Sequence, residues 1–185
     1  IDRNSIVVLY APTFRGSAGD ARWIDSFDEL NIRETSNAIE KRFKRPVVFL
    51  YRAHHAFNRK THNDMLYYDV SNYCDMQELL HLADILVSDY SSCMWDFAIQ
   101  HKIVLVYAPD AKKYIDSRGF FLDINKWPFV VSFNQDELVQ SILNFSEKEY
   151  GDRLSKLLTE SVSYESKSSI DESVKYICDY MEVRE

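Results

Sequence analysis

The stretch that decides the fold is Ile85-Leu86-Val87-Ser88-Asp89-Tyr90-Ser91-Ser92, followed directly by Cys93-Met94-Trp95-Asp96-Phe97-Ala98-Ile99. A short apolar run, a polar turn and a segment that is apolar on nearly every side predict a buried strand, a tight turn and a buried helix. The first N–H groups of a helix lack intrahelical partners and the helix dipole adds partial positive charge, so this turn favours an anion such as phosphate. Ser91 and Ser92 add hydroxyl donors there; the alternative is that these serines only cap the helix.

Strand-like and helix-like segments alternate on both sides of this stretch. Buried strands are predicted at residues 5–11, 47–51 and 102–108, and weaker strand signals lie at 67–70, 121–123 and 130–133. Helical spacing occurs at residues 35–44, 76–83, 135–145, 151–158 and 170–181. This alternation predicts an α/β fold, a Rossmann-like parallel sheet flanked by helices with right-handed crossovers.

Two of the connecting segments carry more specific expectations. Asp75 marks the start of the helix at 76–83, whose Leu79, Leu80 and Leu82 should face the core. Pro109-Asp110 is expected to open a loop that runs to about residue 120.

The composition indicates one globular domain, or one domain with a small appendage. With 185 residues and 46% hydrophobic content, the chain can bury a core, and neither an internal repeat nor a linker divides it. Residues 1–185 are therefore predicted to form a single nucleotide-binding domain. Because the chain starts at Ile1 without a methionine, we expect it to be a fragment of a larger two-domain enzyme.

Charge and cysteine usage restrict the partners and the compartment. A net charge of -7 argues against binding to nucleic acid. The longest apolar run, residues 103–109, is too short to span a membrane, and the amino terminus has no secretory pattern. Cys74, Cys93 and Cys178 have no metal-binding spacing and fit free thiols in a reducing compartment, so a cytoplasmic protein without metal or cofactor is expected.

Polar residues follow the carboxyl ends of the predicted strands, which is where open parallel sheets bind ligands. They are Thr13 and Arg15, then Arg52, His54 and His55, then Ser88, Asp89, Ser91 and Ser92, then Lys112, Lys113 and Arg118. This set is rich in groups that bind phosphate. Neither a GxxxxGK[ST] loop nor a GxGxxG fingerprint is present, so a nucleotide diphosphate held at a helix start is favoured over a P-loop or dinucleotide site.

Four segments together resemble the CDP-glycerol glycerophosphotransferase family, the teichoic acid polymerases and primases. They are Tyr10-Ala11-Pro12-Thr13-Phe14-Arg15-Gly16, Arg52-Ala53-His54, residues 84–92 with Asp96-Phe97-Ala98, and Arg118-Gly119-Phe120. The resemblance implies the carboxyl-terminal, donor-binding half of a GT-B-type transferase. It implies transfer of glycerol phosphate, or a related polyol phosphate, from a CDP-activated donor to a hydroxyl of a growing teichoic-acid-like or capsular polymer. It further implies that the full-length enzyme associates peripherally with the inner face of the plasma membrane.

This resemblance gives the candidate residues their roles. An acceptor hydroxyl would attack the β-phosphorus and CMP would leave, so the protein must position both partners and stabilise charge on the phosphate oxygens. His54, or His55 in its place, would donate to a phosphate oxygen or assist the leaving group. Asp96 would reach the ribose or complement the helix dipole. The expected donor-binding set is Thr13, Arg15, Arg52, Ser88, Asp89, Ser91, Ser92, Asp96, Arg118 and Gly119.

Two other classes of function remain open at this level. One is a GT-B glycosyltransferase donor domain that uses a sugar nucleotide. The other is a non-enzymatic, flavodoxin-like nucleotide- or phosphate-sensing module, in which Asp89 after its strand would be the phosphoacceptor. Under the family interpretation the isolated chain binds the donor without turning it over, and the apolar stripe Ile170, Val174, Ile177 and Met181 packs partly against a missing amino-terminal acceptor domain.

Overall fold

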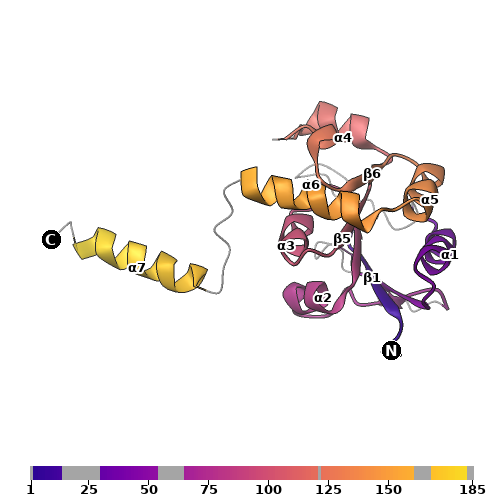
Figure 1. Cartoon of the computed structure of the whole chain (residues 1–185), viewed down its shortest axis with the longest axis horizontal. Helices are drawn as coiled ribbons and strands as arrows, with labels where there is room; N and C mark the ends of the chain where they lie inside the picture. The colour runs from indigo at the N-terminus through magenta and orange to yellow at the C-terminus, as the bar shows by residue number, and fades with distance from the viewer. Residues whose placement is uncertain (1, 14–29, 54–64, 121, 161–167, 183–185) are drawn as a thin grey trace.

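The computed structural model describes residues 2–13, 30–53, 65–120, 122–160 and 168–182. Within them, six parallel strands form one sheet in the order β3-β2-β1-β4-β5-β6, covered by helices on both faces (Figure 1). The strands are β1 (Ile6–Tyr10), β2 (Val47–Tyr51), β3 (Tyr68–Asp69), β4 (Ile85–Ser88), β5 (Ile103–Tyr107) and β6 (Val130–Ser132). The predicted Rossmann-like α/β fold is confirmed.

Helices connect these strands and continue beyond the last one. They are α1 (Ile32–Phe43), α2 (Met76–Leu82), α3 (Cys93–Ile99), α4 (Ala111–Ser117), the 3₁₀ helix η2 (Ile124–Lys126), α5 (Gln135–Leu143), α6 (Glu147–Glu160) and α7 (Ser169–Glu182). Figure 1 shows α1 and α5 on one side of the sheet and α2 and α3 on the other.

The central strand β1 explains why the sheet is covered on both sides. Successive side chains of a strand point to opposite faces, and every residue of β1 is apolar and buried. Val7 and Leu9 join the core cluster that contains residues of α2, α3 and α6. Ile6, Val8 and Tyr10 join the second cluster, which contains residues of α1 and α5. A strand with two apolar faces needs a helical layer on each.

The order of the strands places a switch point beside β1. From β1 the chain proceeds outward to β2 and β3 on one side, and it then returns to β4 on the other side of β1. The connections that follow β1 and β4 therefore lead to strands on opposite sides of this pair. The crevice at the carboxyl ends of two such strands is the usual ligand site of open parallel sheets.

Several sequence predictions need correction. Helix α4 occupies a segment predicted as loop, and Leu122 and Asp123, predicted as part of a strand, are not in one. The reason for the second error is local, because the Asp123 side chain accepts from the Asn125 N–H and starts η2 instead. Leu82, predicted to face the core, is 50% exposed.

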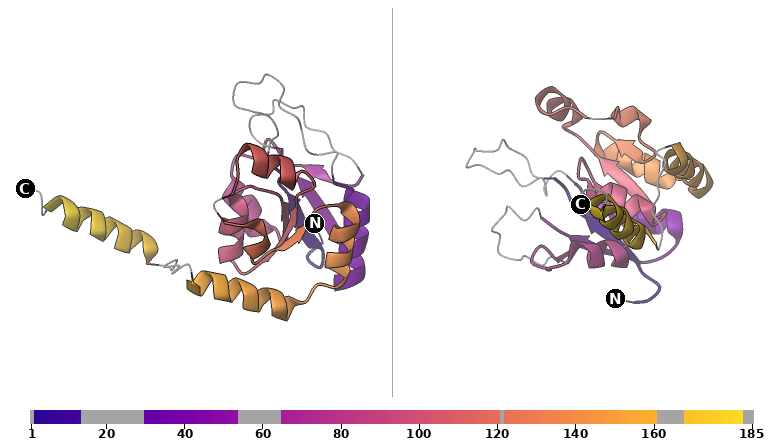
Figure 2. Two further views of the ribbon diagram at one scale, coloured as in Figure 1. Left: turned by 90° about the horizontal axis from the view of Figure 1, so that it is seen from above. Right: turned by 90° about the vertical axis from the view of Figure 1, so that its left-hand side faces the viewer.

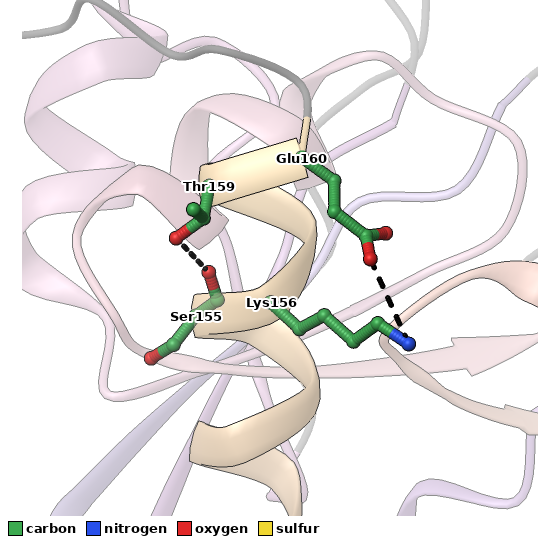
Figure 3. Close-up of polar contacts among 4 residues, drawn as sticks. All are labelled: Ser155, Lys156, Thr159 and Glu160. Carbon is green, nitrogen blue, oxygen red and sulfur yellow. Dashed lines mark hydrogen bonds and ion pairs between the residues drawn. The ribbon is translucent and has the colours of Figure 1, made fainter.

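Helix α6 lies along the domain, whereas α7 stands away from it (Figure 2). The first half of α6 is anchored by the buried Tyr150 and Leu154. Its last turn has local contacts: the Thr159 hydroxyl donates to the Ser155 carbonyl at 2.9 Å, and Lys156 Nζ lies 3.7 Å from Glu160 Oε1 (Figure 3). Exposed pairs of this kind stabilise a helix by a few tenths of a kcal/mol at most, about 0.3–0.5. No helix among the described residues is long and apolar enough to cross a membrane.

Tyr150 supplies a prediction about stability. Its hydroxyl donates to the Lys102 carbonyl at 2.9 Å and accepts from the Val104 N–H at 3.1 Å. Burial raises the pKa of Tyr150 to about 12 from its ordinary value of 10.0. Since the folded pKa is the higher one, the stability linked to this group is complete below pH 10.0 and declines as the pH rises toward about 12.

Tyr150→Phe should therefore lower the free energy of unfolding at neutral pH by about 1–3 kcal/mol, because two buried backbone groups lose their partner. It should also reduce the loss of stability between pH 10 and 12 in denaturant titrations. Tyr176→Phe, at a position 73% exposed on α7, is the control and should change neither quantity. An unchanged alkaline slope in Tyr150→Phe would contradict this account.

Candidate functional site

The ends of β1 and β4 are joined by side-chain hydrogen bonds. The Ser88 hydroxyl donates to the Ala11 carbonyl at 2.7 Å. The carboxylate of Asp89 accepts through Oδ1 from the Thr13 N–H at 2.8 Å and from the Tyr90 N–H at 2.6 Å. Ser88 is 0% exposed and Asp89 is 1% exposed. These bonds fix the start of the loop after β1 against the turn after β4.

The burial of Asp89 bears on its chemistry. A phosphoacceptor must present a carboxylate oxygen to a solvent-borne phosphoryl donor, whereas Asp89 is buried and its Oδ1 holds two backbone N–H groups. This arrangement disfavours the sensing-module alternative. It fits a residue that orients the turn carrying Ser91 and Ser92.

The start of α3 differs from the starts of three other helices. Asn31, Asp75 and Asn134 each accept a hydrogen bond from a backbone N–H in the first turn of α1, α2 and α5. Ser92 is the N-cap residue of α3, yet its side chain makes no capping bond within the described part of the chain. Ser92 is exposed. The capping-only interpretation therefore does not describe Ser92, whose hydroxyl is available at the helix start.

A cavity of about 200 Å³ opens beside this turn. It is lined by Ala11, Pro12, Arg52, Ala53, Met76, Ser91 and Cys93. The lining combines the loops after β1 and β2 with the start of α3, as expected at a switch point. Nη1 of Arg52 donates to the Tyr73 carbonyl at 2.7 Å, which anchors the guanidinium at the wall of the cavity.

Cys93 lies on the wall of this cavity, where burial disfavours the thiolate that a nucleophile requires. Burial raises the pKa of the Cys93 thiol above its ordinary value, while hydrogen bonds with Ser91 and Ser88 act in the opposite direction. The thiol form is therefore favoured, and thiols react far more slowly than thiolates. Its contribution is to shape the cavity.

Arg118 and Gly119 occupy the turn that ends α4. The N–H groups of both residues donate to the Tyr114 carbonyl, at 2.9 and 3.3 Å. Gly119 has φ 71°, in the left-handed region that glycine adopts without strain. The Arg118 guanidinium carbon lies 5.7 Å from the centre of the Tyr114 ring, which stacks on Tyr90. Arg118 is thereby connected to the turn after β4.

The remaining candidates fall into two groups. Arg15, His54 and His55 lie outside the described residues. Asp96 is exposed in the first turn of α3, and Lys112 and Lys113 are exposed on α4. No group of three or more His, Cys, Asp or Glu side chains in the described ranges could hold a metal ion.

The sequence analysis missed several residues at the carboxyl ends of the strands. Met76 and Cys93 line the cavity, and Tyr90 donates through its hydroxyl to Asp110 Oδ1 at 2.8 Å. Asp110 and Tyr114 escaped notice because their segment was predicted as a loop. The signal was the spacing of four residues from Asp110 to Tyr114 and from Tyr114 to Arg118, which places all three on one face of a helix.

A second cavity, of about 350 Å³, lies at the opposite edge of the sheet. It is lined by Ile6, Phe43, Arg45, Asp84, Ile85, His101, Ile103, Phe145, Glu147, Tyr150, Gly151 and Leu154. Although larger, this cavity opens at the amino ends of β1, β4 and β5, away from the switch point. Topology and residue chemistry therefore favour the smaller cavity as the ligand site.

Comparisons with known proteins agree with this fold. The family model described as CDP-Glycerol:Poly(glycerophosphate) glycerophosphotransferase matches residues 1–179. The teichoic acid glycerol-phosphate transferase of Staphylococcus aureus is 33% identical over 144 residues, which are 76% of this chain and 36% of that protein. The teichoic acid poly(glycerol phosphate) polymerase of Bacillus subtilis is 30% identical over 156 residues, 81% of this chain and 20% of that protein.

Solved structures show the same architecture. The wall teichoic acid polymerase TagF matches with a TM-score of 0.69 at 22% identity, over 98% of this chain and 45% of that one. A TagF variant soaked with CDPG matches with a TM-score of 0.64 at 21% identity, over 98% of this chain and 43% of that one. The chain thus spans less than half the length of each of these proteins. With a family model that matches nearly all of its residues, the chain belongs to the CDP-glycerol:poly(glycerophosphate) glycerophosphotransferase family.

Proposed function

We propose that this chain binds the CDP-activated donor for transfer of glycerol phosphate, or a related polyol phosphate, to a hydroxyl of a teichoic-acid-like polymer. The observation that carries the proposal is the crevice between the ends of β1 and β4. There the start of α3, with Ser91 and the exposed Ser92, borders a cavity walled by Arg52. Helix starts and guanidinium groups both favour phosphate oxygens. The family of the chain and the CDPG soak of a TagF variant suggest the rest of the donor.

The chemistry that such a site supports is an in-line displacement. The acceptor oxygen forms a bond to the β-phosphorus while the bond from that phosphorus to the bridging oxygen breaks, and CMP departs with the electron pair. The hydroxyl proton passes to a base. Negative charge grows on the bridging oxygen, so donors aimed at it stabilise the transition state more than the ground state. Ser91, Ser92 and the start of α3 are placed to hold this diphosphate.

Three further residues complete the proposal. Arg118 ends α4 on the same edge and would add a bidentate contact to a phosphate. Arg15 would do the same from the loop after β1. His54, or His55 in its place, would donate a proton to the leaving oxygen, since an imidazole changes charge near neutral pH.

The acceptor is proposed to be held by a separate domain. The apolar stripe on α7 is open to solvent, with Ile170 78%, Val174 55%, Ile177 56% and Met181 65% exposed. Figure 2 shows α7 standing away from the sheet and its covering helices. An apolar helix face of this kind usually packs against another element, and an exposed one marks an interaction surface. An amino-terminal acceptor domain is the proposed cover, and it would close the crevice from its open side.

Calorimetric titration tests donor binding. We expect the chain to bind CDP-glycerol or CDP-ribitol more tightly than CMP and UDP-glucose, because the β-phosphate adds contacts at the start of α3. Ser91→Ala with Ser92→Ala should weaken that binding by at least about tenfold, because even one lost hydrogen bond to a charged group has that effect. The free energy of unfolding should stay within about 0.5 kcal/mol of wild type, since Ser92 does not cap the helix.

The control for this titration is Ser155→Ala, an exposed serine on α6, which should leave affinity unchanged. An unchanged dissociation constant in the double serine variant would reject the anion site. Preference for UDP-glucose over both CDP-polyols would instead support the sugar-nucleotide alternative.

Turnover tests whether this chain suffices for catalysis. Incubated with CDP-glycerol and a glycerol-phosphate primer, the isolated chain should release CMP at least about a hundredfold more slowly than a full-length family member, because the acceptor is not oriented. The measurement is primer-dependent CMP release over time. Sustained release at the full-length rate would show that this chain alone already contains the acceptor site.

A further inference from the structure

Three aromatic rings lie together at the ligand edge, the edge of the sheet formed by the carboxyl ends of its strands. Two of them, Tyr90 and Phe120, also pack against the core cluster, and Phe120 contacts the buried Trp127 with ring centres 5.2 Å apart. Tyr90 and Tyr114 have ring centres 3.9 Å apart at an interplanar angle of 27°. Tyr114 and Phe120 lie 5.3 Å apart at 18°, and Phe120 lies 5.4 Å from Tyr90. All three side chains are only half-buried. We call Tyr90, Tyr114 and Phe120 the ring stack.

The ring stack holds helix α4 against the turn that follows β4. Ala111 is the one buried residue among the seven of α4, so the helix has little core of its own. Tyr114 attaches it to Tyr90, and the Tyr90 hydroxyl donates to Asp110 Oδ1 at 2.8 Å just before the helix begins. Because Tyr90 directly precedes Ser91 in the chain, these contacts fix α4 relative to the start of α3.

The turn after α4 is built on the same stack. Gly119, at φ 71°, reverses the chain so that Phe120 returns onto the Tyr114 ring. A Cβ added to Gly119 would meet no atom closer than 4.0 Å, so a larger side chain would have room there. Glycine is favoured at this position because of the positive φ angle. Arg118, which directly precedes Gly119, is exposed, and its guanidinium carbon lies 5.7 Å from the centre of the Tyr114 ring. The flat face of an aromatic ring attracts a guanidinium group and limits its rotamers.

We propose that Tyr114 is a positioning residue for the donor diphosphate. With Tyr90 and Phe120 it holds the Arg118 guanidinium at a fixed place relative to the start of α3, so that both halves of the anion site meet the same diphosphate. This inference rests on the proposed function, in which Arg118 contacts the donor. An arginine already restricted by a ring loses less conformational freedom on binding, which favours affinity.

A double-mutant cycle on donor affinity tests the role of Tyr114. Tyr114→Leu removes the ring and should weaken binding of CDP-glycerol by about three- to tenfold, the worth of one immobilised long side chain. Tyr114→Phe keeps the ring and should bind within about twofold of wild type. In an Arg118→Ala background, Tyr114→Leu should cause no further loss, because residues that act through one another are not additive.

Phe145→Leu serves as the matched control. Phe145 is a buried ring that packs 6.1 Å from Phe43 at the opposite edge of the sheet, so its loss should lower stability without changing affinity. Thermal unfolding of every variant, followed by circular dichroism, confirms that each is folded at the titration temperature. Additive losses from Tyr114→Leu and Arg118→Ala, or an unchanged affinity in Tyr114→Leu, would overturn the positioning role.

The same cycle with inorganic pyrophosphate separates this inference from the proposed function. If wild type binds pyrophosphate but not CDP-glycerol, and the two substitutions remain coupled, the polyol donor is rejected while the positioning of Arg118 stands. If wild type binds neither ligand, both proposals fail. Coupled losses with both ligands are the expected result.

Discussion

One buried carboxylate joins the backbone that follows β1 to the turn that follows β4, where the ligand edge begins. Asp89 accepts through Oδ1 from the backbone N–H groups of Thr13 and Tyr90, one on each side of the switch point. Hydrogen bonds to a carboxylate are stronger than those between neutral groups, and burial strengthens them further. The crevice, the turn that carries Ser91 and the approach of α4 all depend on this junction.

A chain of contacts connects Asp89 to the other residues of the ligand edge. The Tyr90 backbone is fixed by Asp89, and its ring carries Tyr114 and hence Arg118. The side chains of Asp89, Tyr90 and Tyr114 thus place these groups and have a structural part at this edge. Asp89, although polar and beside the site, is therefore better described as a structural residue than as a ligand-binding one.

Much of the fold could be predicted because the central strands are apolar on both faces. The bounds of β2 and α3 were predicted to the residue, since Pro46 and the polar turn at residues 88–92 leave little choice. Helix α4 was not predicted because its seven residues bury only Ala111 and so carry no apolar period. The contact between Tyr90 and Tyr114 could not be predicted either. The two residues are 24 positions apart in the sequence, so their contact is visible only when the three-dimensional positions of both segments are known.

The central claim is that the donor diphosphate lies at the start of α3, in the crevice between the ends of β1 and β4. Backbone amide NMR of the ¹⁵N-labelled chain, titrated with CDP-glycerol, tests it most directly. The account predicts that the largest shift changes fall on residues 91–94 and 118–119, where N–H groups would meet phosphate oxygens. Largest changes at Asp84, His101 and Glu147, around the cavity at the amino ends of the strands, with the start of α3 unperturbed, would contradict it.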